Sequence, residues 1–275
     1  MINSPFNYTG NKFKLLSQII PLFNKSRTFV DVFAGGGSVY SNVCENYDFI
    51  IVNDIIKELI EIHKELIDNK EYFMKTVRTI SPNKFDKYEY VQLRKRYNSE
   101  KKPEQLYALM LSCNNNMMRF NKKFEFNQTF GHRTLNNSTV KKVDEFSEHL
   151  KKYRSKIYFM SANFTEIQMI EDCMYYLDPP YSNTEAGYNA FWSKKNEEDL
   201  YGYIKKINEF GSSFMVSGLL GEHKDGQRCK LIDNLINDGF RYKVLDFDYE
   251  KVGKLKNKTS QEVVVYNYRE GRYGT

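Results

Sequence analysis

A carboxylate, two prolines and a tyrosine stand in a row after an apolar run at residues 174–177. The run is typical of a buried strand, and because proline cannot continue a central strand, we expect the strand to end at Asp178. Asp178 and the Pro179 carbonyl, held in place by Pro180, would offer two acceptors to the N–H groups of an exocyclic amine. These two hydrogen bonds would favour a tetrahedral amine nitrogen with a free lone pair. Tyr181 would offer a flat face on which a base taken out of the DNA helix can stack. The alternative is an ordinary strand exit with an incidental acid.

Three glycines mark a second candidate site. The β-rich run at residues 29–33 is followed by Gly35, Gly36 and Gly37, and a helix is expected to begin at Ser38. Glycine lets the chain turn sharply and lets a ligand approach the backbone closely. The spacing differs from the six-residue dinucleotide pattern, so it does not indicate NAD binding. The glycines form either a ligand-binding loop or only a tight turn.

Further polar residues could complete a cofactor site. The apolar run at residues 49–53 is followed by Asp54, 19 residues after the first of the three glycines. An acid at the tip of a second strand can accept both ribose hydroxyls of an adenosine group, although Asp54 could instead cap the next helix. In the polar loop at residues 7–12, Tyr8 and Lys12 could hold the amino-acid end of a cofactor, with Lys12 neutralising its carboxylate. The alternative for this loop is a simple cap of the helix that follows.

Alternating patterns predict the elements that would position these residues. Strands are predicted at residues 29–32, 49–54, 157–160, 174–178, 214–216, 242–245 and 263–266. Helices are predicted at about 15–22, 85–97, 104–113, 143–150 and 200–207, with one long helix from about Lys57 that ends before Pro82. Because strands alternate with helices, the expected fold is α/β with a mostly parallel sheet. Open sheets of this kind bind ligands at the carboxyl ends of their strands.

The alternation stops between residues 57 and 139, which predicts an insert of helices and a hairpin between two strands. Within it, residues 84–133 carry 11 Lys/Arg and 5 Asp/Glu, a net charge of +6 that equals the excess of the whole chain. A local basic face is expected of a protein that binds nucleic acid. The candidate phosphate contacts are three basic clusters, Arg94-Lys95-Arg96, Lys101-Lys102 and Lys122-Lys123. The alternative for each cluster is a solvated helix face.

Two polar segments, 114–121 and 128–133, flank a short turn at Lys122 and Lys123 and predict the hairpin. Their side chains suit base edges, because arginine pairs with guanine, asparagine with adenine, and an apolar group meets the thymine methyl. The candidate base contacts are Asn115, Asn116, Met117, Arg119, Thr129 and Arg133.

Length and composition restrict the class of protein. The 275 residues fit one large or two small domains, and a net charge of +6 permits a polyanionic partner without requiring one. The four cysteines are widely spaced and only four histidines are present, so we expect no zinc site and no disulfide framework. With no signal-peptide pattern and no apolar run of about 18 residues, we expect a cytoplasmic protein that binds no membrane.

Taken together, the motifs resemble the Dam family of adenine-N6 DNA methyltransferases over nearly the whole chain. They follow the family's order: Tyr8-Thr9-Gly10-Asn11-Lys12, the glycine loop, Asn53-Asp54, the insert, and the Asp-Pro-Pro-Tyr sequence that ends at Tyr181. The resemblance implies a Rossmann-like methyltransferase fold with a seven-stranded sheet. Residues 1–56 and 140–275 would form the catalytic domain, and residues 57–139 a mainly helical DNA-recognition domain carrying a β-hairpin. The implied reaction is transfer of a methyl group from S-adenosylmethionine to N6 of a flipped adenine in double-stranded DNA, within GATC.

The resemblance also implies roles for single residues. Tyr8, Lys12, Asp54 and Asp178 would contact the cofactor, and Phe164 would lie near its adenine ring. Further cofactor contacts would come from the glycine loop: Asp31, Phe33, Ala34, Gly35 and Gly36. Arg133 matches the arginine that reads guanine in GATC, and Met117 and Arg119 match other hairpin contacts. Thr129 stands where the family has a proline that meets the thymine methyl, and its own methyl could keep that contact. We expect a monomer or a weak dimer on DNA, without a metal ion, in a bacterial or phage-infected cell.

Three other functions are compatible with parts of the pattern. A cytosine-N4 methyltransferase more often carries serine in place of Asp178, and the basic hairpin insert favours duplex DNA over an RNA substrate. A catalytically silent DNA-binding module would not need an intact Asp178, Tyr181 and glycine loop. The carboxylate and lysine cluster of a nuclease is absent from the sequence, so we expect no fused restriction activity, whereas a separate nuclease partner is left open.

Overall fold

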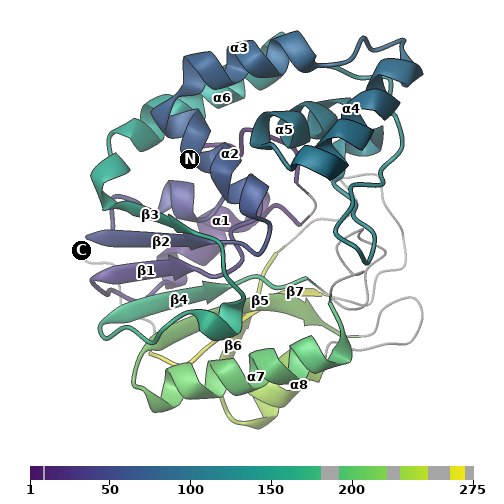
Figure 1. The fold of residues 1–275 in the computed structure, drawn as a ribbon. Helices are drawn as coiled ribbons and strands as arrows, with labels where there is room; N and C mark the ends of the chain where they lie inside the picture. Colours follow the sequence, from purple (N-terminus) through teal and green to yellow (C-terminus); the bar gives the residue numbers. More distant parts are fainter. Residues whose placement is uncertain (9, 181–191, 222–229, 247–260, 270–275) are drawn as a thin grey trace.

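The computed structural model describes all residues of the chain except 9, 181–191, 222–229, 247–260 and 270–275. Its centre is a seven-stranded sheet in the order β3-β2-β1-β4-β5-β7-β6 (Figure 1). The strands are β1 (Thr28–Asp31), β2 (Phe49–Asn53), β3 (Ile157–Met160), β4 (Cys173–Leu177), β5 (Ser213–Leu220), β6 (Arg241–Val244) and β7 (Gln261–Tyr266). Strands β1 to β5 pair in parallel, whereas β7 is antiparallel to β5 and β6. The predicted α/β fold with a mostly parallel seven-stranded sheet is therefore confirmed.

Helices cover the sheet and form the insert. They are α1 (Leu16–Ile19), α2 (Lys57–Asp68), α3 (Lys70–Ile80), α4 (Lys87–Glu100), α5 (Pro103–Ser112), α6 (Asn137–Lys151), α7 (Lys194–Glu209) and α8 (Lys230–Asn237). The prediction of one helix from Lys57 to Pro82 is wrong, because Asn69 leaves the helical region at φ −136° and ψ 33° and separates α2 from α3. Asparagine side chains compete for backbone hydrogen bonds and so favour helix ends. Helix α8 was not predicted.

The helix expected to begin at Ser38 is also absent from the described chain after β1. A single 3₁₀ turn, Tyr40–Asn42, stands in its place. Asn42 Nδ2 donates to the Ser38 carbonyl at 2.8 Å, and Cys44 Sγ donates to the Tyr40 carbonyl at 3.1 Å. Side-chain donors thus take carbonyls that an α-helix would use for its own backbone.

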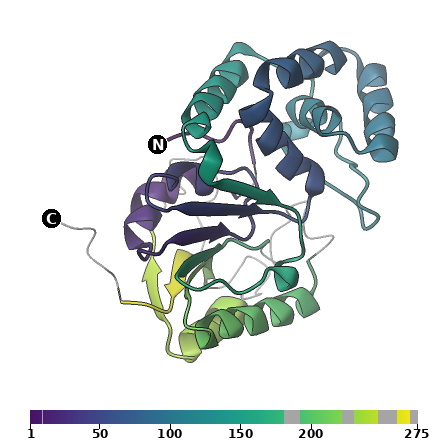
Figure 2. The same ribbon diagram turned by 60° about the vertical axis from the view of Figure 1, so that its left-hand side comes forward.

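Both faces of the sheet are buried at its centre, where every residue of β1 and β4 is buried and β4 is apolar throughout. Alternate residues of a strand point to opposite faces. Met174 and Tyr176 of β4 belong to the core that contains α1, α2 and α6, whereas Tyr175 and Leu177 belong to the core under α7 and α8. Figure 2 shows α7 and α8 on one side of the sheet and the insert helices beyond the other side.

The insert helices share their core with the first of these faces. Helix α5 is buried over most of its length and packs among α2, α3 and α4. The chain then leaves α5 as an excursion over residues 113–133, which we call the insert hairpin. Two isolated antiparallel bridges close it, Cys113–Phe130 and Phe120–Phe126. The expected hairpin is therefore present with isolated pairings in place of a regular ladder, and its turn lies at residues 121–125.

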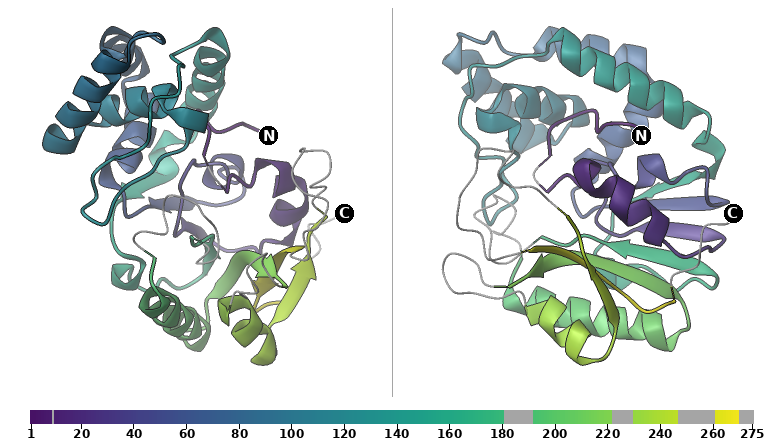
Figure 3. Two further views of the ribbon diagram at one scale, coloured as in Figure 1. Left: turned by 90° about the vertical axis from the view of Figure 1, so that its right-hand side faces the viewer. Right: turned by 180° about the vertical axis from the view of Figure 1, so that it is seen from behind.

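The order of the strands places the topological switch point of the sheet between β1 and β4. From β1 the chain continues to β2 and β3 on one side, whereas β4 continues to β5 on the other. Open α/β sheets bind ligands at such a switch point, outside the carboxyl ends of the strands. The carboxyl ends of β1, β2 and β4 lie on the same side of the molecule as the insert hairpin (Figure 3).

Candidate active site

Three aspartates gather at the switch point. Asp31 is the last residue of β1, and Asp54 and Asp178 directly follow β2 and β4. Asp31 is in register with Val52 of β2 and Tyr176 of β4. Because the three strands are adjacent and parallel, their carboxyl ends bring the three acids to one edge of the sheet.

Asp178 is held by an ion pair with Lys12. The Lys12 Nζ lies 2.8 Å from both carboxylate oxygens of Asp178 and donates to the Gly10 carbonyl at 3.0 Å. The lysine side chain is 4% exposed and the aspartate 17%. Each charge therefore offsets the desolvation of the other. Lys12 was expected to face a cofactor carboxylate, and the structure places it on Asp178. Pro179 is buried behind this pair, and Tyr181 lies outside the described residues.

Asp31 is a buried acid with one unused oxygen. Its Oδ2 accepts the Tyr40 N–H at 3.2 Å, whereas Oδ1 is buried and has no hydrogen-bond partner in the described part of the chain. Burial raises the pKa of Asp31 from 3.8 to about 8, opposed by the Tyr40 hydrogen bond and reinforced by the charges of Asp178 and Asp54. A buried acceptor without a partner costs about 1–3 kcal/mol. The position therefore suits a ligand that brings a donor or a positive charge.

Asp54 connects the glycine loop to α2. Its Oδ2 accepts the Gly35 N–H at 3.0 Å, and its Oδ1 accepts the N–H of Ile56, the residue before α2, at 2.9 Å. Burial raises the pKa of Asp54 from 3.8 to about 6, and the hydrogen bonds from Ile56 and Gly35 limit the rise. A carboxylate has about four lone-pair sites. Asp54 can thus support the backbone here and still accept hydroxyl groups of a ligand.

Tyr8 lies against the glycine loop and explains two of its glycines. A Cβ on Gly35 would come within 2.7 Å of Tyr8 Cε1, and one on Gly36 within 2.7 Å of Tyr8 Cβ. Gly35 also has φ +48°, in the left-handed region that favours glycine. The two glycines therefore let the N-terminal loop and the β1 loop approach each other closely.

His63 is a residue of this site that the sequence analysis missed. It is fully buried on α2, with Nε2 2.8 Å from the Gly35 carbonyl and Nδ1 3.1 Å from the Tyr40 hydroxyl. Since a carbonyl only accepts, Nε2 carries the proton and Nδ1 accepts from Tyr40. Burial lowers the pKa of His63 from 6.5 to about 4, opposed by the Gly35 hydrogen bond. The available sequence signal was a histidine on the apolar stripe of α2.

Three aromatic rings form a cluster at the same edge of the sheet. The ring centroids are 5.7 Å apart for Phe33 and Phe164, 5.8 Å for Phe33 and Trp192, and 6.0 Å for Phe164 and Trp192. Trp192 was not predicted. Its Nε1 is buried and has no hydrogen-bond partner among the residues that the structure describes. Because a buried indole N–H usually finds an acceptor, the cluster offers flat faces and one free donor to a planar ligand.

One side of α4 holds the insert hairpin in place. Four side chains donate to hairpin carbonyls: Tyr90 and Arg94 to Gln128 at 2.8 and 3.2 Å, Asn98 to Phe126 at 3.1 Å, and Lys101, just after α4, to Phe124. Asn98 Oδ1 also accepts the Phe126 N–H at 2.7 Å. Arg94 and Lys101 were predicted to contact DNA phosphates, and the structure places their donors on the protein's own backbone.

The candidate base contacts lie on the hairpin and beside its start. Asn115 and Asn116 have φ +54° and +52°, a conformation that asparagine tolerates better than most residues. Arg133 Nη1 donates to Asn116 Oδ1 at 3.5 Å. The remaining predicted side chains differ in exposure, with Met117 half-buried and Arg119, Lys122 and Thr129 exposed. The structure thus brings Arg133 beside Asn116, while Arg119 and Lys122 extend from the hairpin surface.

Comparison with known proteins shows the family. The D12 class of N6 adenine-specific DNA methyltransferases matches residues 8–252. The chain belongs to this family. The modification methylase StsI of Streptococcus sanguinis is 31% identical to the D12-class chain, and the type II methyltransferase M.FokI of Planomicrobium okeanokoites is 32% identical. Each alignment covers 97% of this chain and 43% of the relative, so the chain spans less than half the length of these two proteins. A DNA adenine methylase of Salmonella typhi is 25% identical over 78% of this chain and 79% of its own length.

Among the described residues, no group of three or more His, Cys, Asp and Glu side chains could hold a metal ion. No helix in the described ranges is long and apolar enough to cross a membrane. Cys44, Cys113 and Cys173 are buried free thiols.

Proposed function

We propose that this chain transfers the methyl group of S-adenosylmethionine to the N6 amine of an adenine in duplex DNA. The observation that carries the proposal is Asp178, ion-paired with Lys12 at the switch point of the sheet and next to the buried Asp31. Membership of the D12 class supports the reaction and its base. The names of the relatives StsI and M.FokI support a role as a modification enzyme.

The site residues have the chemistry that S-adenosylmethionine would need. The unused Oδ1 of Asp31 can accept from the ammonium group of its amino-acid end. Asp54 can accept ribose hydroxyls, and the rings of Phe33, Phe164 and Trp192 can enclose a purine. The free Trp192 Nε1–H would donate to a ring nitrogen. Tyr8, which packs on the glycine loop, would close the site from the N-terminal side.

Bound S-adenosylmethionine would supply a methyl group on a positively charged sulfur, which is a strong electrophile. Asp178 and the Pro179 carbonyl would accept the two N–H bonds of the target amine, so that its nitrogen becomes tetrahedral and its lone pair is free. The Lys12 ion pair fixes the position of the Asp178 carboxylate. Such pre-positioned acceptors stabilise charge that develops during the reaction. An adenine must leave the duplex to reach them, and Tyr181 would stack on it.

The insert hairpin would recognise the DNA sequence. Arg133 is exposed at the end of the hairpin and next to Asn116, which suits a bidentate contact with guanine. Met117, Arg119 and Thr129 are the other candidates on this surface. We propose GATC as the first sequence to test, because Arg133 matches the guanine-reading arginine of the Dam family.

The proposal is tested by single-turnover methylation of a duplex that contains GATC. We expect Asp178→Ala to give no product and Asp178→Asn to lose on the order of 100-fold or more in rate, since removing one transition-state acceptor has effects of this size. Asp199→Asn, which changes an exposed aspartate on α7, is the matched control and should keep the wild-type rate.

Sequencing that detects methylated bases, applied to DNA from cells that express the protein, identifies the base and its site. Full activity of Asp178→Ala would overturn the mechanism. Methyl groups on cytosine N4 would instead support the runner-up reaction.

A further inference from the structure

Asn53 is a buried polar residue that joins the ends of three strands. It is the last residue of β2 and is 1% exposed. Its Nδ2 donates to the Val32 carbonyl at 3.0 Å and to the Ala162 carbonyl at 3.2 Å, and its Oδ1 accepts the Ala162 N–H at 3.0 Å. Val32 follows β1 and Ala162 follows β3, and these strands lie on either side of β2. One amide side chain therefore ties the loop after β1 to the loop after β3.

These two loops carry the phenylalanines of the aromatic cluster. The residue before Phe33 accepts from the Asn53 side chain, and the N–H of Ala34, the residue after it, donates to the Asn53 carbonyl at 2.8 Å. Phe164 comes two residues after Ala162, which the same side chain holds at both its N–H and its carbonyl. The ring centroids of Phe33 and Phe164 are 5.7 Å apart. The backbones behind both rings are thus bonded to one residue.

A second asparagine fixes the turn that carries Phe164. Asn163 Oδ1 accepts the N–H and the hydroxyl of Thr165 at 3.1 and 3.0 Å, and the Asn163 N–H donates to Glu166 Oε2 at 3.2 Å. This reciprocal pairing is a capping box, which satisfies N–H groups at the start of a helical turn. Because Phe164 is the first residue of the 3₁₀ turn Phe164–Glu166, the cap holds the backbone that carries the ring.

We propose that Asn53 and Asn163 are positioning residues, which set the spacing of Phe33 and Phe164 for the purine of S-adenosylmethionine. Both side chains bond other groups of the protein, so they act through the rings. A gap of about 0.5–1 Å forfeits roughly a quarter to a half of a dispersion contact, so a small shift of either loop should weaken the binding of a purine. The inference rests on the proposed function, which assigns these rings to the cofactor.

The first test measures cofactor binding and turnover in variants of Asn53. Asn53→Ala removes its three side-chain hydrogen bonds. Asn53→Thr keeps a residue that suits a strand, so it preserves the fold, but its hydroxyl is too short to span both neighbouring loops. We expect both variants to raise the Kd from calorimetry and the KM for S-adenosylmethionine by about 10-fold. The kcat at saturating cofactor should stay within about twofold, because the Asp178 ion pair is not displaced.

Asn267→Ala is the matched control for Asn53→Ala. Asn267 Oδ1 accepts the Phe214 N–H at 2.9 Å, and its Nδ2 donates to the Ser212 carbonyl at 2.9 Å. These bonds are of the same kind, but they lie at the amino end of β5, opposite the carboxyl ends that hold the rings. Asn267→Ala should therefore lower the melting temperature and bind S-adenosylmethionine like wild type.

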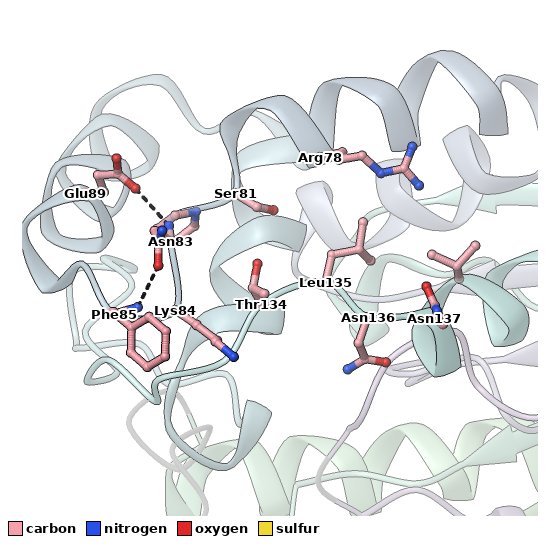
Figure 4. A pocket seen from close by; sticks show the side chains of 12 residues that line it. Arg78, Ser81, Asn83, Lys84, Phe85, Glu89, Thr134, Leu135, Asn136 and Asn137 are labelled. Carbon is pink, nitrogen blue, oxygen red and sulfur yellow. Dashed lines mark hydrogen bonds between the residues drawn. The ribbon is translucent and has the colours of Figure 1, made fainter.

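Asn163→Ala tests the same loop from the surface and leaves the bonds between the strands in place. We expect it to raise the Kd for S-adenosylmethionine several-fold, with kcat at saturating cofactor unchanged. Asn136→Ala is its control, because Asn136 Oδ1 also accepts the N–H and the hydroxyl of a threonine, Thr139, at 3.0 and 3.3 Å. Asn136 lines a cleft of the insert to which none of the three rings contributes (Figure 4), so its loss should not change cofactor binding.

Fluorescence gives a readout of the rings themselves, because Trp192 is the single tryptophan of the sequence and belongs to the cluster. Without cofactor, Asn53→Thr and Asn163→Ala should emit at longer wavelength than wild type, since loosened rings expose the indole. Asn267→Ala and Asn136→Ala should emit like wild type. Wild-type affinity and emission in Asn53→Thr and Asn163→Ala, or a loss of affinity that both controls share, would overturn the inference. A wild-type protein that does not bind S-adenosylmethionine would instead overturn the proposed function.

Discussion

At the scale of single residues, burial decides the protonation of Asp31. The pKa of about 8 keeps this carboxyl mainly protonated at pH 7. A positive ammonium group beside its unused Oδ1 favours the charged carboxylate over the neutral acid. Binding of a cationic ligand here should therefore release a proton.

We expect the affinity for S-adenosylmethionine to rise from about pH 6 to about pH 8 and to level off above, because Asp31 loses its proton over this range. Calorimetry at pH 7 in two buffers of different ionisation enthalpy should show proton release on binding. Asp31→Asn should abolish most of the release, whereas the exposed control Asp199→Asn should preserve it. Binding by the wild type with no proton release would contradict the role of Asp31.

His63 is buried as a neutral imidazole, so its protonation differs between the folded and the unfolded protein. A histidine with a pKa near 4 in the folded state and 6.5 in the unfolded state binds its proton more readily when unfolded. The contribution of His63 to the free energy of unfolding is therefore complete above about pH 6.5 and is lost as pH falls toward 4. At pH 4.5 the loss should be about 2–3 kcal/mol. Asp31 and Asp54, whose pKa values are raised, act in the opposite direction.

The measurement therefore compares His63→Gln with wild type at each pH by urea unfolding. Glutamine keeps a donor for the Gly35 carbonyl and does not titrate. The difference in the free energy of unfolding should shift by about 2–3 kcal/mol in favour of the variant between pH 7.5 and 4.5. A difference that stays constant with pH would show that His63 does not titrate as a buried group.

At the scale of elements, α4 acts as the support of the insert hairpin. Its donors occupy hairpin carbonyls from residue 124 to residue 128. Aromatic contacts add to the hydrogen bonds, with centroids 5.2 Å apart for the tilted pair Tyr90 and Phe130 and 6.2 Å apart for the edge-to-face pair Tyr97 and Phe126. A surface that recognises bases must be held rigidly to discriminate among them.

Asn98→Ala should loosen the hairpin, because it removes two hydrogen bonds to the Phe126 backbone. We expect discrimination between the cognate sequence and single mismatches to fall by about 1–2 kcal/mol, while affinity for unrelated DNA stays the same. Ser99→Ala, on the exposed side of α4, is the control and should discriminate like wild type. If Asn98→Ala only lowers the melting temperature and discriminates normally, the support by α4 does not contribute to specificity.

At the scale of the whole molecule, positive charge is concentrated on one part of the chain. Residues 84–133 hold a net charge of +6, the same as the entire protein. Of the predicted phosphate contacts, Lys122 lies at the exposed turn of the hairpin beside Lys123, whereas Arg94 and Lys101 bind the hairpin backbone. Salt-dependent binding should therefore depend on the turn more than on α4.

Lys122→Ala/Lys123→Ala should reduce the slope of log affinity against log salt by about 2, since each phosphate contact contributes about 0.9. Lys151→Ala/Lys152→Ala removes equal charge where α6 leads to the amino end of β3, and should leave the slope unchanged. The slopes are measured by anisotropy titrations on a GATC duplex. An unchanged slope in the turn variant would place the main phosphate contacts elsewhere.

Local sequence patterns predict the strands and the acids at their tips. Apolar runs bounded by Asp31, Asp54 and Asp178 are local patterns, and their periodicity records which residues are buried. Two helical predictions were wrong: after Ser38 a side-chain donor takes a carbonyl that a helix would use, and at Asn69 the backbone leaves the helical region, and hydrophobic periodicity reports neither.

The partners of the polar residues, by contrast, depend on how distant parts of the chain fold together. Lys12 meets Asp178 across 166 positions, and His63 meets Tyr40 across 23, so neither contact follows from local spacing. The pKa of Asp31 is raised mainly by burial and further by two other acids brought beside it by the strand order β2-β1-β4. Arg94 and Lys101 look like solvent-facing cations in sequence, yet they face the hairpin, because the direction of a side chain on a polar helix is set by what packs against it. The partner of a charged group, its protonation state and the direction of its side chain thus depend on non-local contacts. The positions of strands, helices and turns depend largely on local sequence.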